Sequence, residues 1–406
     1  MRSSLGFTTI QCSYVSQLLL TSVCASLIGC VVAGSGPPRP ARCEYSGMEH
    51  LPADSPECVP PAPPPPPLAL PPIFAGGQGP IADSITTLRV HYATDRLRLP
   101  GNVVGYSRSR GRLEYGVLDV SIPPGHRPGD LESPRWMRLE FNFDPRKHVM
   151  LHRVRPLGQA EMFGSLAEAV KGVSSHEMFV FVHGYNVSFE DAARRTAQIA
   201  FDLNLRIVPV MYSWPSQASA APWAYTADEV SIEKTMPNLR SFLEQVAAKS
   251  GASRIHLIAH SMGSRGMMRA LEQIAQAPRP VAFHNVILAA PDIDRDVFIE
   301  QIAPRLRRSV QRVTLYASAN DEALKASRKI HGAPRLGEAG ATLTVLKGME
   351  TIDASQVDGD WLGHSYIAAN KQILDDLFSA TVLDKAARDR NLRPSARRGV
   401  QYWILP

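Results

Sequence analysis

One short segment limits what this chain can fold into more than any other. Residues 259–263 are Ala-His-Ser-Met-Gly; they end an apolar run that begins at Arg254 and precede a stretch with helical periodicity. A serine at such a junction is typical of a strand, a sharp turn and a helix, with small residues two places before and after it. Ala259 and Gly263 meet that need, although glycine is usual at both places. A turn that lifts the Ser261 hydroxyl above a sheet edge favours acyl-transfer chemistry.

Two residues further along the chain complete a pattern for nucleophilic catalysis. Asp321 follows the apolar run at 313–320, and His364 precedes a last amphipathic segment. A neutral serine is a poor nucleophile, so a histidine must accept its proton and a carboxylate must orient that histidine. We therefore predict a triad of Ser261, His364 and Asp321.

The acid of this triad has alternatives. Asp292 and Asp294 follow the preceding apolar run and could replace Asp321. A neighbouring histidine, His260, is expected to be a packing or hydrogen-bonding residue rather than a second base.

An earlier apolar run, at 178–182, predicts the oxyanion hole. It ends in His-Gly-Tyr-Asn at 183–186. A His-Gly pair at a strand end lets the backbone turn sharply and points the next amide into the site. We predict the backbone amides of Tyr185 and Met262 as donors to the oxyanion, each worth about 3–4 kcal/mol. The residues predicted to border the substrate pocket are His183, Asn186 and Trp214.

The hydrophobic pattern predicts an α/β fold. Short apolar runs lie at 178–182, 207–211, 255–259, 286–289 and 313–317, with helical patterns between them. Runs without alternation suit parallel strands buried on both faces. Alternating strands and helices indicate a mostly parallel, doubly wound sheet that binds ligands at the carboxyl ends of its strands. Ser261, Asp321 and His183 all fall at such ends.

Residues 83–160 form a β-rich N-terminal part. Apolar and polar residues alternate at 136–144, and Leu113, Tyr115 and Val117 alternate similarly. Period-2 alternation predicts strands with one face in water, which we expect at the antiparallel edge of the main sheet. The catalytic core is then expected at 161–384.

Further predictions concern the loop and helix residues that follow the core strands. Residues 212–237 contain Trp214, Trp223 and Tyr225 and are expected to form either an apolar wall beside the site or a surface excursion. A helix with Pro237 near its first turn is predicted around Leu239.

The start of the chain has the features of a lipoprotein. Residues 1–30 combine a basic residue, an apolar stretch and the segment Leu-Ile-Gly-Cys at 27–30, which predicts a signal peptide cleaved before a lipid-modified Cys30. Valine rather than aspartate follows this cysteine, which favours the outer membrane. We expect a bacterial envelope location with the membrane as a partner through the lipid anchor.

A linker separates this segment from the folded part. Residues 31–82 are rich in proline and contain Cys43 and Cys58, which either pair or remain thiols. A proline tract takes an extended conformation and acts as a stiff spacer.

Charge and residue clusters exclude other classes of protein. The formal net charge is +6, and part of the excess lies in the segment at 385–406, predicted to be a solvated basic tail. No nucleic-acid motif accompanies it, so no nucleic acid is expected as a partner. No ligand-spaced cluster of His or Cys occurs in the core, so no metal and no cofactor are predicted.

Seven short motifs resemble those of an uncharacterised bacterial family of α/β-hydrolases, a domain of unknown function. They are YATDR at 92–96, VSIPPGH at 120–126, FVHGYN at 181–186, YSWPS at 212–216, AHSMG at 259–263, LAAPDID at 288–294 and GHSY at 363–366. They occur in order and cover about residues 85–380. The resemblance implies the α/β-hydrolase fold and a serine-hydrolase site, but no particular substrate.

These observations favour a serine hydrolase, of the esterase or lipase kind, that cleaves carboxylic esters or lipids through an acyl-enzyme. Two other functions use the same features. One is a non-catalytic binding or scaffold lipoprotein on a hydrolase fold, and the other is an acyltransferase.

Overall fold

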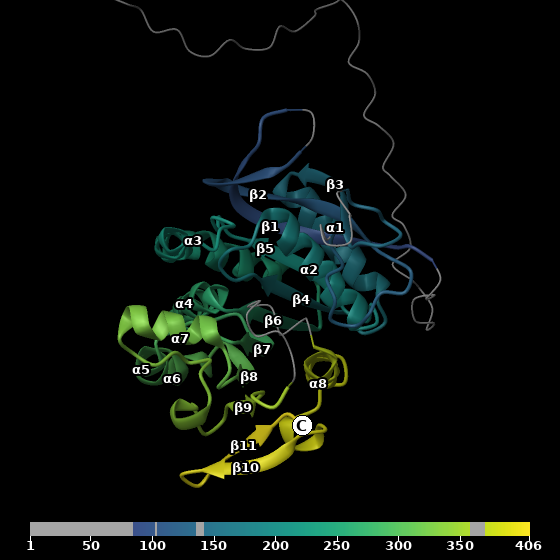
Figure 1. Ribbon diagram of the computed structural model, residues 1–406. Coiled ribbons are helices and arrows are strands. Elements are labelled where there is room, and N and C mark those ends of the chain that lie inside the picture. Colours follow the sequence, from purple (N-terminus) through teal and green to yellow (C-terminus); the bar gives the residue numbers. More distant parts are fainter. Residues whose placement is uncertain (1–83, 102–103, 135–141, 358–369) are drawn as a thin grey trace, which may run out of the picture. The chain divides into compact units, whose positions relative to one another are not determined.

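The computed structural model describes residues 84–101, 104–134, 142–357 and 370–406. Within these ranges eleven strands form one sheet in the order β10-β11-β9-β8-β7-β6-β4-β5-β1-β2-β3 (Figure 1). The strands are β1 (Thr86–Arg98), β2 (Tyr106–Ile122), β3 (Met150–Leu157), β4 (Glu177–Val182), β5 (Val208–Ser213), β6 (Arg254–His260), β7 (Phe283–Ala289), β8 (Val310–Ala317), β9 (Glu350–Asp353), β10 (Arg393–Arg397) and β11 (Val400–Ile404). The helices are α1 (Gln159–Gly172), α2 (Phe189–Asp202), α3 (Pro222–Lys249), α4 (Met262–Gln276), α5 (Arg295–Val297), the π-helix η2 (Phe298–Ile302), α6 (Ala303–Leu306), α7 (Glu322–His331), η3 (Gly340–Thr342), α8 (Lys371–Thr381) and η6 (Ala387–Asp389).

The centre of the sheet is parallel, as the apolar runs predicted. Strands β9, β8, β7, β6, β4 and β5 pair in parallel, and every residue of β4 and β5 is buried. Such strands lie between two layers, so their side chains face apolar cores on both sides. The carboxyl ends of β4, β6, β7 and β8 therefore lie along the same edge of the sheet.

Two apolar cores lie on opposite faces of this sheet. In β4, Met178 and Val180 belong to one core and Phe179 and Phe181 to the other, because successive strand residues point to opposite faces. The first core includes residues of α1, α3 and α4, and the second includes residues of α2 and α8. Figure 1 shows α4 and α8 on the two sides of the central strands.

The N-terminal strands are antiparallel, as expected. β1 pairs with β2 and β2 with β3 in antiparallel register, while β1 joins the central sheet through parallel pairing with β5. The alternation at 113–117 lies in β2. The strand predicted at 136–144 falls for the most part outside the described residues, and residues 142–144 are not in a strand.

Helix α3 begins much earlier than predicted. Pro222 occupies its first turn, so residues 222–237, which include Trp223 and Tyr225, are helical and Pro237 lies inside the helix. The interior proline removes one helical hydrogen bond. Side chains of the helix also bind neighbouring elements: Thr235 donates to Asp95 on β1 at 2.6 Å, and Asp228 accepts from Ser216 at 2.6 Å.

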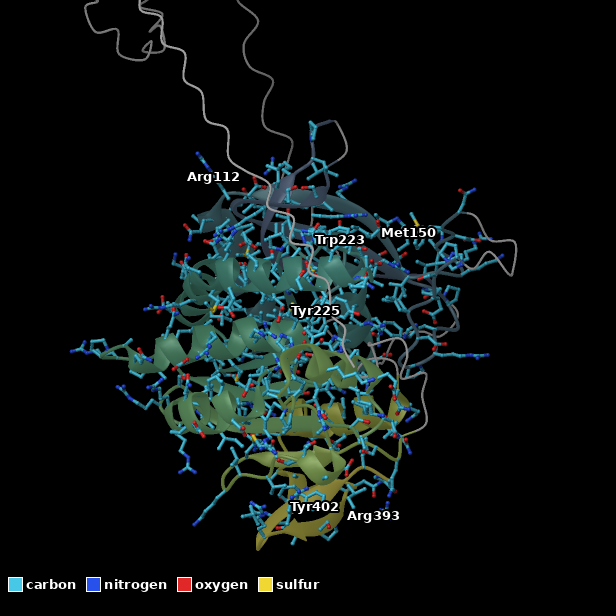
Figure 2. The ribbon with its side chains drawn as sticks, turned by 60° about the vertical axis from the view of Figure 1, so that its left-hand side comes forward. Arg112, Met150, Trp223, Tyr225, Arg393 and Tyr402 are labelled. Atoms are coloured by element: carbon cyan, nitrogen blue, oxygen red, sulfur yellow. The ribbon has the colours of Figure 1, made fainter. Side chains whose placement is uncertain are left out.

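The predicted basic tail is folded and forms an edge of the sheet. β10 and β11 form an antiparallel hairpin, and β11 pairs in parallel with β9. Figure 2 labels Arg393 and Tyr402 on this hairpin. Arg390, just before it, is buried between Asp376 at 2.9 Å and Glu350 at 2.5 Å. The basic residues suggested a solvated tail, but exposed edge strands also commonly carry charges. Arg390 is neutralised by carboxylates that are distant in sequence, which a local pattern does not show.

Candidate active site

Ser261 lies in a strained turn between β6 and α4. Its φ of 51° and ψ of −126° are unusual for a residue with a side chain. Conformations of this kind cost about 1–3 kcal/mol and persist only where the surroundings enforce them. Here the Ser261 amide donates to Ala289 O at 2.9 Å, and Ser261 O accepts from the Asp292 amide at 3.2 Å. The backbone after β7 therefore holds the serine in place from both sides.

The small residues around Ser261 are required by close backbone contacts. A Cβ at Gly263 would lie 2.2 Å from His183 O, so only glycine fits there. A Cβ at Gly184 would lie 3.0 Å from Ser261 Cβ and 3.0 Å from His260 Nδ1. Ala259 is fully buried in β6 and pairs with Val182 of β4. The loop after β4 is thus pressed against the serine turn.

This contact brings the two predicted oxyanion donors to the same edge of the sheet. Tyr185 belongs to the loop that follows β4, and Met262 is the buried first residue of the 15-residue helix α4. The amino end of a helix carries a partial positive charge that favours an anion nearby.

The residues predicted to border the substrate pocket have different positions. Asn186 is exposed, with a left-handed φ of 56°, whereas His183 and Trp214 are almost fully buried. The His183 ring stacks on Trp214 with ring centres 5.1 Å apart, and Trp214 Nε1 donates to His183 O at 2.7 Å. His183 and Trp214 therefore support the loop from beneath rather than line an open surface.

His183 is held as a neutral ring. Its Nδ1 donates to Gly184 O at 2.8 Å, and its Nε2 lies 3.1 Å from Ser213 Oγ. Burial, together with the charge of Arg96, lowers the pKa of His183 to about 3. A neutral histidine with both nitrogens engaged orders the loop but is a poor base.

Arg96 on β1 is a supporting residue whose role sequence reasoning missed. Its Nε donates to Ser213 Oγ at 2.9 Å, its Nη1 to Ser216 O at 3.1 Å and its Nη2 to Val187 O at 2.8 Å. These contacts join the end of β5 and the loops that follow β4 and β5 at the carboxyl edge of the sheet. The sequence feature that could have indicated this role is the position of Arg96 in the YATDR motif, which by itself shows only the family resemblance.

Asp321 follows β8 at the same edge of the sheet. It is buried and caps helix α7, where its Oδ1 accepts from the Leu324 amide at 2.9 Å. The end of β8 and the loop before Asp321 also contact residues that follow β9: Ala354 N donates to Ala317 O at 2.8 Å, and Asn320 Nδ2 donates to Ser355 O at 2.9 Å.

The two alternative acids have other partners. Asp292 Oδ1 accepts from Arg335 Nε and from Ser327 Oγ, each at 2.7 Å, and its Oδ2 accepts from the Tyr225 hydroxyl at 2.5 Å. Burial would raise the pKa of Asp292, but the charges of Arg335 and Arg265 outweigh burial and lower that pKa. Asp294 caps α5 by accepting from two backbone amides at 3.0 Å.

The cluster around Asp292 also touches the loop that follows β4. The ring of Tyr225 packs edge-on against the ring of Tyr185, with centres 5.5 Å apart. Tyr225 thereby links Asp292 to the loop that follows β4.

Two predicted residues fall outside the described residues: His364 and Cys30. In the described part of the chain, no group of three or more His, Cys, Asp or Glu side chains is arranged to hold a metal ion. The helices of the same part include none with the length and apolar character needed to cross a membrane.

Comparisons with known proteins place the chain in a family. An uncharacterised protein, alr1448 of Nostoc sp. (strain PCC 7120), is 24% identical over 243 residues, which cover 51% of this chain and 60% of that protein. Among solved structures, the phospholipase PlaB of Legionella pneumophila, in complex with thio-NAD, is 10% identical over 56% of this chain and 67% of its own. Its TM-score of 0.21 is too low to bear on function. Residues 159–382 match the family described as "Alpha/beta hydrolase of unknown function (DUF900)", more than half of the chain. This protein therefore belongs to that α/β-hydrolase family.

Proposed function

We propose that the protein is a serine hydrolase that cleaves carboxylic esters, with Ser261 as its nucleophile. The observation that carries this proposal is the strained turn at Ser261, enforced by the backbone of Ala289 and Asp292 and by the close approach of Gly184. Strain of this kind concentrates at functional sites, and here it coincides with a serine at the carboxyl edge of a parallel sheet.

In the first half of the reaction, Ser261 Oγ attacks the ester carbonyl carbon while His364 takes the hydroxyl proton. The carbonyl oxygen becomes an oxyanion that accepts hydrogen bonds from the Tyr185 and Met262 amides. When the carbonyl re-forms, the bond to the leaving alkoxide breaks, and the alkoxide takes the proton from His364 and departs as an alcohol.

In the second half, water replaces the alcohol. It gives a proton to His364 and attacks the acyl-enzyme carbon, and collapse of the second oxyanion breaks the bond to Ser261 Oγ. The serine regains its proton from His364, and the carboxylic acid leaves. The reaction uses only groups of this chain and water.

Asp321 is the acid that this proposal assigns. Both carboxylate oxygens of Asp292 already accept from Arg335, Ser327 and Tyr225. Asp294 is only half-buried, whereas Asp321 is buried. Residues 354 and 355 contact Ala317 and Asn320, which come shortly before Asp321, and these contacts support Asp321 as the partner of His364 further along the chain.

Fluorophosphonate labelling of the full chain tests the nucleophile. The wild type should be labelled and should hydrolyse p-nitrophenyl esters, while Ser261→Ala should lose the label and lower turnover on the order of 10⁶-fold. Ser264→Ala is the matched control, because Ser264 is buried one turn further in α4 and its hydroxyl donates to Ala259 O at 3.2 Å.

Other outcomes would redirect the proposal. A folded wild type that takes no label would contradict it and favour a binding protein on a hydrolase fold. Acyl transfer to an added alcohol in excess of hydrolysis would make the protein an acyltransferase through the same serine.

A further inference from the structure

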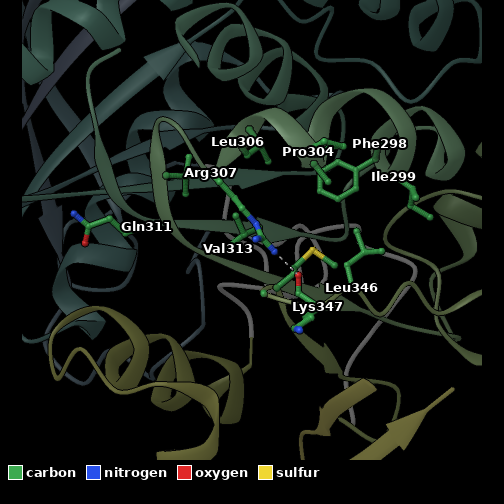
Figure 3. Close-up of a pocket in the computed structure, with 13 residues that line it drawn as sticks. Phe298, Ile299, Pro304, Leu306, Arg307, Gln311, Val313, Leu346 and Lys347 are labelled. Atoms are coloured by element: carbon green, nitrogen blue, oxygen red, sulfur yellow. Dashed lines mark hydrogen bonds between the residues drawn. The ribbon is translucent and has the colours of Figure 1, made fainter. Parts of the chain in front are cut away.

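A cavity lies away from the proposed active site. It has a volume of about 410 Å³ and is formed by η2, α6, the start of β8 and the turn at 346–349 (Figure 3). Val310 and Val313 line it, whereas the proposed acid Asp321 follows the opposite end of the same strand. At about 3.3 Å per residue, Val313 is roughly 13 Å from the last residue of β8.

The floor of this cavity is apolar. Nine of its thirteen lining residues are apolar, and the buried ones form its base. The base residues are Phe298, Leu306, Val310 and Met349, and Leu346 and Val313 are half-buried beside them. Ligand sites in proteins commonly have volumes of about 300–1,000 Å³ and apolar walls. A cavity at the small end of this range suits one aliphatic chain rather than a two-chain lipid.

Two cations stand at its rim. Arg307 and Lys347 are exposed, and none of the thirteen lining residues is acidic. Within the described ranges, neither side chain forms a salt bridge with a carboxylate, whereas Arg305 in the same turn pairs with Glu272. The cationic rim is therefore uncompensated beside an apolar floor.

The position of Arg307 is fixed by the turn rather than by an acid. Its Nη2 donates to Lys347 O at 3.0 Å, the contact drawn in Figure 3. Gly348 has a φ of +87°, and a Cβ there would lie 2.8 Å from Arg307 Nη2. A guanidinium held in this way keeps other donors for a planar anion, which it binds through two parallel hydrogen bonds.

The wall of the cavity contains a rare element. The π-helix η2 supplies Phe298 and Ile299 between α5 and α6. Single π turns are uncommon and are frequent at functional sites, which is an observation independent of the rim charges.

We propose that this cavity binds a single-chain amphiphilic carboxylate, with its aliphatic chain on the apolar floor and its carboxylate at Arg307 and Lys347. Such a carboxylate has two sources: a fatty acid in solution or a fatty acid within a bilayer. A neutral or cationic head would lose the pairing with the rim.

Titration calorimetry of the full chain with decanoate below its micelle concentration tests this assignment. The wild type should bind one decanoate and should bind decyltrimethylammonium at least tenfold more weakly. Arg307→Gln with Lys347→Gln should weaken decanoate binding at least tenfold. Arg112→Gln, an exposed arginine of β2 labelled in Figure 2, is the matched control and should bind as the wild type does.

A second variant locates the binding in the cavity. Ala303 lines it, so Ala303→Trp should fill the space and abolish binding while the thermal unfolding midpoint stays near that of the wild type. Decanoate binding that survives Ala303→Trp in a folded variant lies elsewhere, such as at the proposed active site, and would overturn the assignment. Equal affinity for decanoate and the ammonium would overturn it as well.

Vesicles separate the two sources of the carboxylate. If the free acid is the ligand, neutral phosphatidylcholine vesicles loaded with decanoate should compete with dissolved decanoate for binding in the cavity. If the chain binds the loaded vesicles but not dissolved decanoate, the ligand is taken from the bilayer. Binding to vesicles that contain no decanoate, with none to the acid, would contradict the proposal.

Discussion

Gly263 has no space for a side chain, although it is a helical residue only two positions after the proposed nucleophile. The contact of an added Cβ would be with the backbone oxygen of His183, which cannot rotate away. The loop with Tyr185 and the start of α4, which form the proposed oxyanion hole, can therefore approach each other only because Gly263 has no Cβ.

Gly263→Ala should accordingly destabilise the protein by about 1–3 kcal/mol, the usual range for overpacking. It should also reduce labelling at Ser261, because the loop with Tyr185 must move. Urea unfolding measures the first effect. Gly164→Ala in α1 is the control, since nothing lies within 4 Å of a Cβ there, and it should gain about 1 kcal/mol from helix propensity. A Gly263→Ala variant as stable and as reactive as the wild type would refute the close approach.

The two acids should separate when each is changed to asparagine. Asp321→Asn should lower turnover by up to about 10⁴-fold. Asp292→Asn should instead lower stability by about 3–5 kcal/mol, because it leaves Arg335 buried without its carboxylate. Steady-state kinetics and denaturant unfolding of both variants give the comparison. A larger loss of turnover in a folded Asp292→Asn variant would exchange the two roles.

The sharp turn at Ser261 and the position of Asp321 after a strand were predictable from the sequence, because their signals lie within a few neighbouring residues. The support for them was not predictable, since Arg96 reaches partners 87 to 120 residues away. Trp214 is predicted to border a substrate pocket but is buried, because the sequence of a loop after a strand does not indicate whether its aromatic residue is buried.

At the scale of elements, the central strands were predictable and the boundaries of the ends were not. Continuous apolar runs mark β4 to β8 because both faces of these strands are buried. The hairpin β10–β11 has no such mark, since its residues are half-buried or exposed at one edge of the sheet. Its place depends on pairing with β9 and on the ion pairs of Arg390, neither of which a local pattern can indicate.

Arg390→Gln should therefore destabilise the C-terminal elements. The change leaves the buried Asp376 without its cation and Glu350 with only the distant Arg312, at 3.9 Å, at a cost of about 3–5 kcal/mol. Hydrogen exchange should show faster exchange in β9 and β11 than in the wild type. Arg388→Gln is the matched control, because among the described residues Arg388 pairs only with its exposed neighbour Asp389, at 3.5 Å, and it should change stability little. If both variants unfold alike, the buried pair contributes nothing particular.

At the scale of the whole molecule, stability should depend on pH through His126. This ring lies between two carboxylates, with Nδ1 2.9 Å from Glu132 and Nε2 3.1 Å from Asp202 at the end of α2. Burial lowers its pKa, but the hydrogen bonds and charges of Asp202 and Glu132 outweigh burial and raise the pKa to about 9. The cation ties the loop after β2 to the end of α2.

The folded pKa of His126 is above its usual value of 6.5, so its contribution to stability is fully present below pH 6.5. It should decline as the pH rises from 6.5 through 9, by about 1.4 kcal/mol for each unit of pKa difference. Urea unfolding at pH 6 and pH 10 tests this, with His126→Gln as reference. The wild type should lose its advantage over His126→Gln at the higher pH. A constant difference between the two would show that the cation is not the source.

Arg96 and Arg390 both lie outside the region that matches the family, which matters when parts of this protein are exchanged with those of relatives. The family match spans residues 159–382, yet Arg96 precedes it and Arg390 follows it. One supports the loop beneath the proposed nucleophile, and the other neutralises two carboxylates of the interior. The smallest transplantable unit is therefore wider than the region that defines the family. A chimera joined at residues 159 and 382 would contain the serine turn but would lack both arginines. A segment that begins before residue 84 and extends past Arg390 would keep both.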